Sequence, residues 1–440
     1  MKKFLSVFLA ASLLVSMTGC NKPDDESVVS GAPATDEAVS SVTPDESSVA
    51  TTSSTESAVV EDIPEVPYEL GGELTPTMIA NSVLHEGNQA RLARVIRKLQ
   101  AGEDVTIAYL GGSITQGSSA GNELCYARLT TNWFEEQFPE AKINYVNAGI
   151  GATGSYIGLH RADRDVLAHD PDLVFIDFSV NDTSDRMAIN NATYEGLIRK
   201  LWSYETAPAI ICLAMTQENG TSVQDEHSEI AIRYDIPFIS YRNAILDVID
   251  KGYIVWDDIS DDNIHPNIPG HAVLTKMITN YIQGVVDNVD SIGDEEPELA
   301  ETDANGMKYQ NAEIVVPGDA RCTATGVFAE HTGGFGNFGN PWLARVSGGT
   351  EVDGGLEFTV EAQNIGILYG KMVTKGGKLD VYIDGELVKT IDCTFPGGWG
   401  SYVEFAEITS FDEVGEHTVK LVPQSLDDAA AYYVSALTIS

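Results

Sequence analysis

The sequence predicts an α/β domain with a parallel sheet and helices on both faces, followed by a β-sandwich domain. The chain has 440 residues, which is more than one ordinary hydrophobic core accommodates, so two folded domains are expected. Between residues 76 and 286, apolar β-rich runs alternate with amphipathic segments. From residue 306 onward, short alternating segments are separated by turns.

The α/β domain is assigned to residues 76–286. Its apolar runs predict buried strands at Val105–Leu110, Ile143–Asn147, Leu173–Phe178, Ala209–Met215 and Ile236–Tyr241. The amphipathic segments predict helices at Gln89–Gln100, Tyr126–Phe138, Tyr156–Ala168, Tyr194–Tyr204, His227–Tyr234 and His271–Val286. Because strands and helices alternate, the sheet is expected to be parallel and covered on both faces.

The segment 306–440 is assigned to the β-sandwich. Its short alternating segments are Gly355–Glu361, Gly366–Tyr369, Lys378–Ile383, Glu386–Ile391 and His417–Val422. Asp384-Gly385 lies between two of these segments and predicts a two-residue hairpin turn. Residues 287–305 are acidic and contain glycine and proline, so they are expected to link the two domains.

The N-terminal segment predicts export. Two lysines precede an apolar run from Phe4 to Val15, which is typical of a secretory signal peptide, assigned to residues 1–19. The residues before Cys20 resemble a bacterial lipobox, which implies that Cys20 is lipidated and anchors the protein at the bacterial cell surface. Ordinary secretion is the alternative. Residues 20–75 are rich in Ser, Thr and acidic residues and are expected to form a disordered linker.

The net charge excludes several functions. The chain has 26 Lys and Arg against 66 Asp and Glu, a formal charge of −40. Nucleic-acid binding requires basic residues to neutralise phosphates, so no nucleic-acid partner is expected. Anionic lipid is also disfavoured as a docking surface, so membrane contact is expected through the lipid anchor only. The five cysteines lack zinc-binding spacing, and no metal is expected. Cys322 and Cys393 are expected to be free thiols. A disulfide between them is the alternative.

Residues suited to acyl transfer follow the predicted strands. Ser113 comes directly after Gly111 and Gly112 at the end of the first strand, where parallel α/β sheets place their sites. A serine nucleophile also needs a base and an oxyanion hole. His265 precedes the last helix and is suited to act as the base, and Asp262, three residues earlier, is suited to orient its imidazole.

Two further segments offer hydrogen-bond donors. The glycine-rich turn Asn147–Gly154 follows the second strand and presents backbone N–H groups. Asn181 follows the third strand and presents a side-chain amide. Both are therefore candidates for an oxyanion hole.

In this order and at these strand ends, the four motifs resemble those of the SGNH (GDSL-like) hydrolases, over about residues 86–286. The resemblance implies a flavodoxin-like three-layer α/β/α domain that needs no cofactor. It implies that Ser113 is the nucleophile, His265 the general base and acid, and Asp262 the orienting carboxylate. The implied oxyanion hole consists of the Ser113 N–H, a backbone N–H of the second motif and the Asn181 side chain.

The sequence departs from the family pattern at two positions. Gly112 stands where many members have Asp, but that aspartate is not part of the triad. In the second motif, the family glycine falls on Gly151 or, one register later, on Ala152. Gly151 is chosen here as the oxyanion donor, with Ala152 as the alternative.

An exported, tethered hydrolase domain followed by a sandwich resembles the bacterial carbohydrate esterases. The resemblance implies a surface-tethered serine esterase that removes O-acetyl groups from a polysaccharide or oligosaccharide. Trp342 and Trp399 lie in glycine-rich loops of the sandwich and are candidate glycan contacts, because aromatic rings stack on sugar faces. Packing of these rings in the core is the alternative. Two other functions remain open: a short-chain lipid or thioester hydrolase, and a glycan-binding protein with little catalysis.

Overall fold

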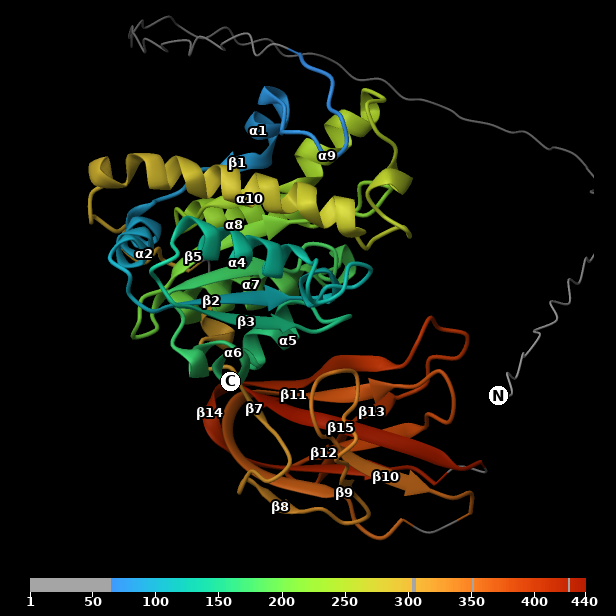
Figure 1. Cartoon of the computed structure of the whole chain (residues 1–440). Coiled ribbons are helices and arrows are strands. Elements are labelled where there is room, and N and C mark those ends of the chain that lie inside the picture. The colour runs from blue at the N-terminus through green and yellow to red at the C-terminus, as the bar shows by residue number, and fades with distance from the viewer. Residues whose placement is uncertain (1–64, 303–305, 350–351, 426–427) are drawn as a thin grey trace, which may run out of the picture. The chain divides into compact units, whose positions relative to one another are not determined.

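The computed structural model describes residues 65–302, 306–349, 352–425 and 428–440 (Figure 1). The predicted signal peptide, Cys20 and most of the predicted N-terminal linker lie outside the described residues. The last part of that linker, residues 65–75, packs on the α/β domain, where Tyr68 is buried in the core and Thr75 caps the helix that begins at Pro76, so the linker prediction is wrong there. The described residues belong to one compact unit. Among their helices, none has both the length and the apolar composition that crossing a bilayer requires.

A six-stranded sheet forms the centre of the first domain. Its strands are β1 (Val83–His85), β2 (Val105–Gly111), β3 (Ile143–Gly149), β4 (Leu173–Asp177), β5 (Ala209–Ala214) and β6 (Phe238–Ser240). Their spatial order is β1-β6-β5-β4-β2-β3, and only the β1–β6 pair is antiparallel. Without β1, this is the order of flavodoxin-like folds. The predicted fold class is therefore confirmed, with one additional antiparallel edge strand.

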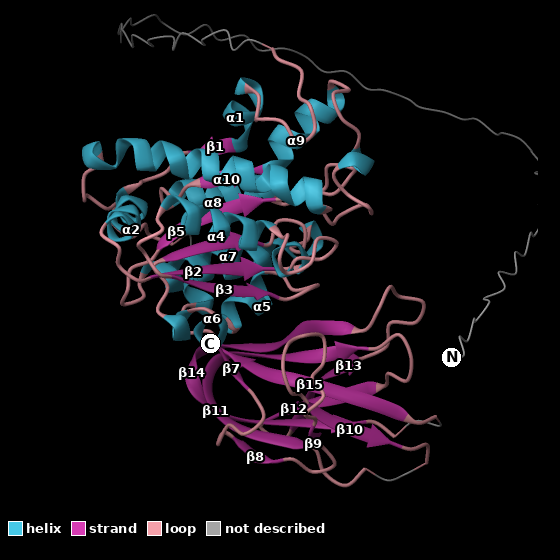
Figure 2. Cartoon of the chain, viewed as in Figure 1, coloured by secondary structure: helices cyan, strands magenta, loops and turns pink. Residues whose placement is uncertain are grey.

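Helices cover both faces of this sheet (Figure 2). One apolar cluster includes side chains of α1 (Pro76–Ser82), α2 (Ala90–Gln100), α4 (Tyr126–Gln137), α9 (Tyr241–Asp250) and α10 (Ile268–Asn288). The cluster on the other face includes side chains of α5 (Ser155–His160), α6 (Ala162–Asp165), α7 (Met187–Trp202) and α8 (Gln224–Arg233). The helices α1 and α9 were not predicted from the sequence. Because side chains alternate along a strand, Tyr109 of β2 joins the first cluster and Leu110 the second.

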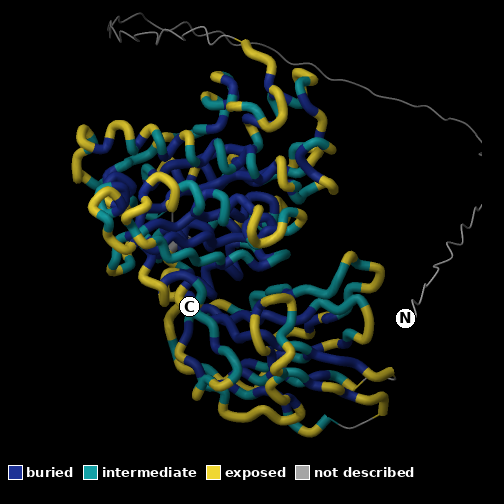
Figure 3. The backbone as a smooth tube through the Cα atoms, viewed as in Figure 1, coloured by how far each residue is buried: buried dark blue, intermediate teal, exposed yellow. Residues whose placement is uncertain are grey.

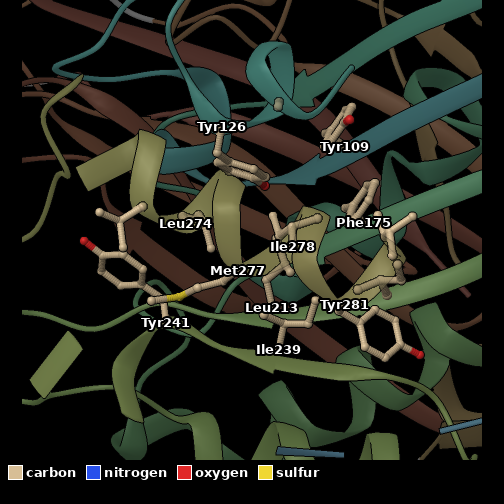
Figure 4. Close-up of a cluster of buried hydrophobic side chains, with 14 of the residues drawn as sticks. Tyr109, Tyr126, Phe175, Leu213, Ile239, Tyr241, Leu274, Met277, Ile278 and Tyr281 are labelled. Atoms are coloured by element: carbon tan, nitrogen blue, oxygen red, sulfur yellow. The ribbon is translucent and has the colours of Figure 1, made fainter. Parts of the chain in front are cut away.

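The residues of both clusters are buried, and Figure 3 shows much of the backbone inside this domain as buried. In the first cluster, the rings of Tyr109 and Phe175 stack with their centroids 4.8 Å apart, and Leu274 and Ile278 of α10 lie in the same cluster (Figure 4). Every residue of β2 is buried, as expected for a strand covered on both faces. The strand that carries Ser113 at its end is therefore fixed from both sides.

The closing helix α10 begins at Ile268, before the predicted start at His271. Its N-cap is Asn267, whose side-chain oxygen accepts a hydrogen bond from the Gly270 N–H at 3.1 Å. A proline in the first turn is compatible with this start, because the first helical N–H groups have no partner within the helix. The cap fixes the end of the loop that carries His265.

The second domain is an antiparallel β-structure, as predicted. Its strands are β7 (Glu313–Val315), β8 (Cys322–Ala324), β9 (Ala329–Glu330), β10 (Trp342–Val346), β11 (Leu356–Lys371), β12 (Lys378–Ile383), β13 (Glu386–Asp392), β14 (Tyr402–Pro423) and β15 (Ala430–Ile439). The long strands β11 and β14 pair along their length, with irregularities between Ala362 and Asn364 and between Ile365 and Gly366. Such bulges bend a strand and allow it to serve two packed layers.

The turn between β12 and β13 confirms the predicted hairpin. Asp384 and Gly385 both have positive φ, 51° and 87°. Two consecutive positive φ values define the type I′ turn that suits the twist of a two-residue hairpin.

Residues of the two domains contact each other directly. Tyr156 of α5 and Leu368 of β11 belong to the same buried cluster. The Tyr156 hydroxyl lies 2.8 Å from Thr438 Oγ1. The predicted linker 287–305 is also tied to the α/β domain, since Glu296 accepts a hydrogen bond from Arg91 at 2.6 Å.

Candidate active site

Ser113 stands at the carboxyl end of β2, as the first residue of the short helix α3 (Ser113–Gln116). The turn before it leaves no space for side chains. A Cβ on Gly111 would lie 2.1 Å from Thr115 Oγ1, and a Cβ on Gly112 would lie 2.0 Å from Asn181 Oδ1. The two glycines therefore allow the helix and the Asn181 loop to approach the strand end closely.

Ser113, His265 and Asp262 form a hydrogen-bonded chain. His265 Nε2 lies 2.9 Å from Ser113 Oγ, and His265 Nδ1 lies 2.8 Å from Asp262 Oδ2. This is the geometry in which a carboxylate orients an imidazole toward a serine hydroxyl. The structure thus brings together the three predicted triad residues from two loops that are far apart in sequence.

Asp262 is held by its own loop. Its Oδ1 accepts hydrogen bonds from the backbone N–H groups of Ile264 and His265, at 2.8 and 2.7 Å. Partial burial opposes ionisation, but the hydrogen bonds from the His265 N–H, the His265 ring and the Ile264 N–H hold the pKa of Asp262 below its usual value. The carboxylate therefore stays ionised opposite the imidazole.

The loop that carries the pair is closed by two further donors. Ser260 Oγ lies 2.8 Å from the Asp262 carbonyl oxygen and 2.6 Å from that of His265. The Trp256 indole N–H donates to the Asp262 carbonyl oxygen at 2.7 Å. These contacts fix the backbone on both sides of the Asp262–His265 pair.

In the second motif, the backbone N–H that was predicted as the oxyanion donor is already hydrogen-bonded. The N–H of Gly151, chosen as the oxyanion donor, instead donates to Gln116 Oε1 at 2.7 Å. The N–H of Ala152 makes no hydrogen bond within the described part of the chain. Ala152 also has a φ of +60°, the left-handed conformation that favours glycine. Of the two candidate donors, the Gly151 N–H is therefore engaged and the Ala152 N–H has no partner among the described residues.

A buried contact between Asp182 and His227 fixes the loops of the second and third motifs. Asp182 Oδ1 accepts the Ser155 N–H at 2.8 Å, and Asp182 Oδ2 lies 3.0 Å from His227 Nε2. The imidazole of His227 is fully buried and stacks on the Tyr194 ring, with centroids 3.7 Å apart. Because Asp182 follows Asn181 directly, this pair also fixes the backbone next to the Asn181 amide. The helical pattern around His227 predicts a solvent-facing position for it, and this prediction is wrong because the ring is buried.

Arg161 is a second residue that sequence reasoning missed. Its buried guanidinium donates to the Gly111 carbonyl oxygen at 3.0 Å and to Asp165 at 3.1 Å. The same carbonyl oxygen accepts the Ile150 N–H at 3.0 Å. Arg161 therefore links the strand end before Ser113 to the second motif. It also stands where the predicted helix Tyr156–Ala168 is divided into α5 and α6.

The two tryptophans predicted as glycan contacts differ. Trp342 is only 2% exposed and packs edge-on against Phe358, so it is a core residue and does not present a face to a sugar. This corrects the expectation for Trp342. Trp399 is 72% exposed and stacks on Tyr402, with ring centroids 5.0 Å apart. Its ring lies open to solvent.

The described residues were also searched for side chains that could hold a metal ion. Within the described ranges, no group of three or more His, Cys, Asp or Glu side chains is arranged to hold a metal ion. Cys322 and Cys393 are free thiols, the first half-buried and the second buried.

Comparisons with known proteins agree with this geometry. The model of the GDSL-like lipase/acylhydrolase family matches residues 109–273, which include Ser113 and His265. Among solved structures, a two-domain esterase (CEX) active on acetylated mannans is 31% identical with a TM-score of 0.75, and the match covers 82% of this chain and 98% of that chain. A structure of the esterase co-crystallised with mannopentaose is also 31% identical with a TM-score of 0.73, over 82% of this chain and 97% of that chain. No curated protein matches the sequence significantly.

The match to the two-domain esterase spans both domains of the chain, and the family model covers the segment from β2 to the start of α10. The chain is an ester-hydrolysing enzyme and belongs to the GDSL-like lipase/acylhydrolase family, the SGNH hydrolases.

Proposed function

We propose that this enzyme removes O-acetyl groups from a polysaccharide, with acetylated mannan as the leading substrate. The observation that carries this proposal is the 31% identity, over 82% of the chain, to a two-domain esterase active on acetylated mannans. The similarity extends over the antiparallel domain as well as the α/β domain. This supports a common substrate class more strongly than a catalytic domain alone would.

The proposed reaction begins at Ser113. Its Oγ attacks the acetyl carbonyl carbon while His265 Nε2, 2.9 Å away, takes the hydroxyl proton. Asp262 keeps the other ring nitrogen protonated and stabilises the imidazolium that forms. The two backbone N–H groups that bind Asp262 Oδ1 hold the carboxylate in place beside the imidazole during the transfer.

The tetrahedral intermediate carries a negative oxygen that needs preorganised donors. The proposed donors are the backbone N–H groups of Ser113 and Ala152 and the side-chain amide of Asn181. Asn181 packs against Gly112, next to the nucleophile, and Asp182 fixes its backbone through Ser155 and His227. No metal or cofactor takes part in this scheme.

The intermediate collapses when His265 gives its proton to the departing sugar hydroxyl, which leaves an acetyl group on Ser113. A water molecule then attacks this ester and gives a proton to His265. Acetate leaves, and the proton returns to Ser113. Each half of the cycle breaks one ester bond: the first half passes the Ser113 proton to the sugar oxygen, and the second half passes a proton from water to Ser113.

We also propose that the enzyme is exported and anchored through Cys20, with the acidic segment that precedes the described residues as a tether. The charged start, the apolar run and the lipobox-like residues support this. In bacteria grown with labelled palmitate, the full-length protein is expected to incorporate label and the Cys20→Ala variant is not. Label on both proteins would contradict the proposal.

A substrate panel tests the proposed function. Acetate release by the wild-type enzyme is measured on acetylated mannan, xylan and pectin, together with kcat/KM on aryl esters of increasing acyl length. The expected result is highest activity on a neutral acetylated polysaccharide and a preference for acetyl among the aryl esters. An optimum beyond butyrate would favour a lipid or thioester hydrolase, and no turnover with saturable glycan binding would favour a binding protein.

A further inference from the structure

A pocket of about 510 Å³ lies directly beside the nucleophile helix and takes no part in the proposed chemistry. It is bounded by α3, by the start of α4 and by β3, which contacts both helices. The side chains that line it are those of Gln116, Asn122, Glu123, Arg128, Tyr145 and Asn147. This volume lies within the range usual for small-molecule sites.

The pocket reaches the reaction centre through Gln116. A Cβ on Gly151 would lie 3.1 Å from Gln116 Oε1 and 3.7 Å from Ser113 Cβ, so both side chains border the same point of the second motif. A Cβ on Gly149 would lie 2.2 Å from the Gln116 backbone nitrogen, so α3 packs tightly on β3 here. A group bound in the pocket is therefore a close neighbour of an ester at Ser113.

The floor of the pocket is fixed by hydrogen bonds. Asn147 Nδ2 donates to the Thr115 carbonyl oxygen at 2.9 Å and to the Tyr145 hydroxyl at 3.1 Å. Arg128 Nη2 donates to both carboxylate oxygens of Glu135, at 3.1 and 2.8 Å, and its guanidinium lies 5.3 Å from the centre of the Tyr145 ring. A rigid polar floor suits a ligand that must be held in one orientation.

The rim, by contrast, carries hydrogen-bonding groups without partners. Within the described residues, the side chains of Asn122 and Glu123 make no hydrogen bond or ion pair, and the Nε2 of Gln116 donates to none. These three groups offer both donors and acceptors toward one pocket. Such a mixture fits the hydroxyl groups of a sugar, each of which donates and accepts.

The composition of the lining disfavours aliphatic and anionic ligands. No Leu, Ile, Val or Met side chain lines the pocket, so an aliphatic acyl chain would gain no apolar contact there. The carboxylate of Glu123 opposes an anionic ligand, and the charge of Arg128 is already paired with Glu135. A neutral polyhydroxylated ring is the class that remains.

We propose that this pocket is a subsite for a neutral sugar unit of the substrate chain, adjacent to the unit that carries the acetyl ester. Gln116, Asn122 and Glu123 bind its hydroxyl groups and determine specificity, and Arg128 and Asn147 shape the floor. The inference rests on the proposed function and extends it by naming where the glycan next to the ester is held.

The test compares two substrates in one set of variants. kcat/KM is measured for an acetylated manno-oligosaccharide and for 4-nitrophenyl acetate, which has no sugar. In the Asn122→Ala/Glu123→Ala double variant, the ratio of oligosaccharide to aryl acetate kcat/KM is expected to fall at least about tenfold, mainly through KM. The matched control is Glu136→Ala, an exposed glutamate on α4 outside the pocket, for which the wild-type ratio is expected.

A ratio within about twofold of wild type in the double variant would overturn the subsite while leaving the esterase function intact. If the wild-type enzyme hydrolyses the aryl ester but not the oligosaccharide, the proposed substrate is wrong. The subsite is then tested separately, by measuring the binding of a manno-oligosaccharide. Calorimetric titration of the Ser113→Ala enzyme with mannotriose should show a Kd that weakens at least about tenfold when the two rim side chains are removed. No mannotriose binding, or an unchanged Kd, would overturn it.

Discussion

Asp262 shows how single contacts define a chemical role. One of its carboxylate oxygens accepts two backbone N–H groups, and the other faces the imidazole of His265. The backbone therefore decides which oxygen is free for the ring. The ring in turn keeps its second nitrogen toward Ser113.

Replacing Asp262 by Asn should remove the base. The Asn oxygen would still accept the two backbone N–H groups, so its NH₂ group would face His265 Nδ1 and impose the tautomer that carries the proton on Nε2. That ring cannot accept the Ser113 proton. We expect kcat to fall by roughly 10³-fold or more with the fold intact, measured by acetate release and circular dichroism.

Asp257→Asn is the control for this variant, since Asp257 is exposed in the same loop and makes no ion pair among the described residues. It should retain wild-type kcat. Near-wild-type activity of Asp262→Asn would show that Asp262 does not orient the base.

His227 acts at a distance from the chemistry, as a positioning residue. In a His227→Phe variant, the ring can still stack on Tyr194, but Asp182 loses one of its two partners. We expect a tenfold or greater fall in kcat with little change in KM, because Asn181 and the second motif lose their support. Steady-state kinetics and thermal unfolding measure this. Loss of thermal stability with an unchanged kcat would indicate a purely structural role.

Sequence reasoning predicts a site residue when its role follows from its place in a recognisable motif. Ser113, Asn181, Asp262 and His265 stand in recognisable motifs, so their convergence could be expected. Gln116, Arg161 and His227 carry no such mark. Their roles depend on which backbone group a buried or neighbouring side chain reaches, and that is decided by tertiary packing.

At the scale of elements, the turn from β2 to α3 determines how closely the oxyanion donors approach the nucleophile. Gly112 leaves room for the Asn181 side chain, which would meet a Cβ there at 2.0 Å. The family resemblance drew attention to this position because many members carry Asp. In this chain, the close approach of Asn181 explains why the position is occupied by glycine.

A Gly112→Ala variant should separate folding from catalysis. The added methyl group displaces the flexible end of Asn181 rather than the backbone. We therefore expect the free energy of unfolding to fall by only about 1 kcal/mol. Loss of one oxyanion donor should lower kcat by about 10²-fold. Thermal unfolding and aryl acetate kinetics measure the two effects.

The control for this variant is Gly284→Ala on α10, where an added Cβ meets nothing within 4 Å. It should retain wild-type kcat. A fully active Gly112→Ala enzyme would remove Asn181 from the proposed oxyanion hole.

Other elements show where pattern reasoning ends. The five parallel strands were predictable because each is a β-rich, largely apolar run between amphipathic segments. The three-residue edge strand β1 is too short to give a period, and it exists because it pairs with β6. Similarly, Trp342 lies in a loop-like glycine-rich sequence, yet it begins β10 and packs on Phe358.

At the scale of the whole molecule, the charge of −40 is distributed unevenly. Part of the acidic segment after α10 is paired with basic side chains of α2, since Glu296 contacts Arg91 and Arg94 and Asp294 contacts Arg97. These exposed or half-buried pairs contribute little energy singly. They do place the acidic segment along the α/β domain before the chain enters the antiparallel domain.

A buried carboxyl group couples the stability of this domain to pH. Burial raises the pKa of Asp177, at the end of β4, to about 7, despite hydrogen bonds from Ser179. In the unfolded chain, its pKa is about 3.9. Below about pH 4, Asp177 is protonated in both the folded and the unfolded chain and does not affect stability. As the pH rises from 4 to 7, only the unfolded chain ionises Asp177, so the free energy of unfolding falls.

An Asp177→Asn variant should avoid this loss. The difference in unfolding free energy between the variant and the wild type is expected to grow between about pH 4 and pH 7. Above pH 7 it should level off at a few kcal/mol, and thermal unfolding at each pH measures it. The Asp257→Asn protein is the reference. A difference that does not depend on pH would mean that Asp177 is ionised in the folded enzyme throughout this range.

The central claim is that Ser113 is the nucleophile of a polysaccharide acetylesterase. The most direct measurement is acetate release from acetylated mannan by wild-type and Ser113→Ala enzymes of equal folded concentration. The account predicts saturable release by the wild-type enzyme and a loss of roughly 10³-fold or more in the variant. Equal release by both proteins, or none by the folded wild-type enzyme on any acetylated polysaccharide, would contradict it.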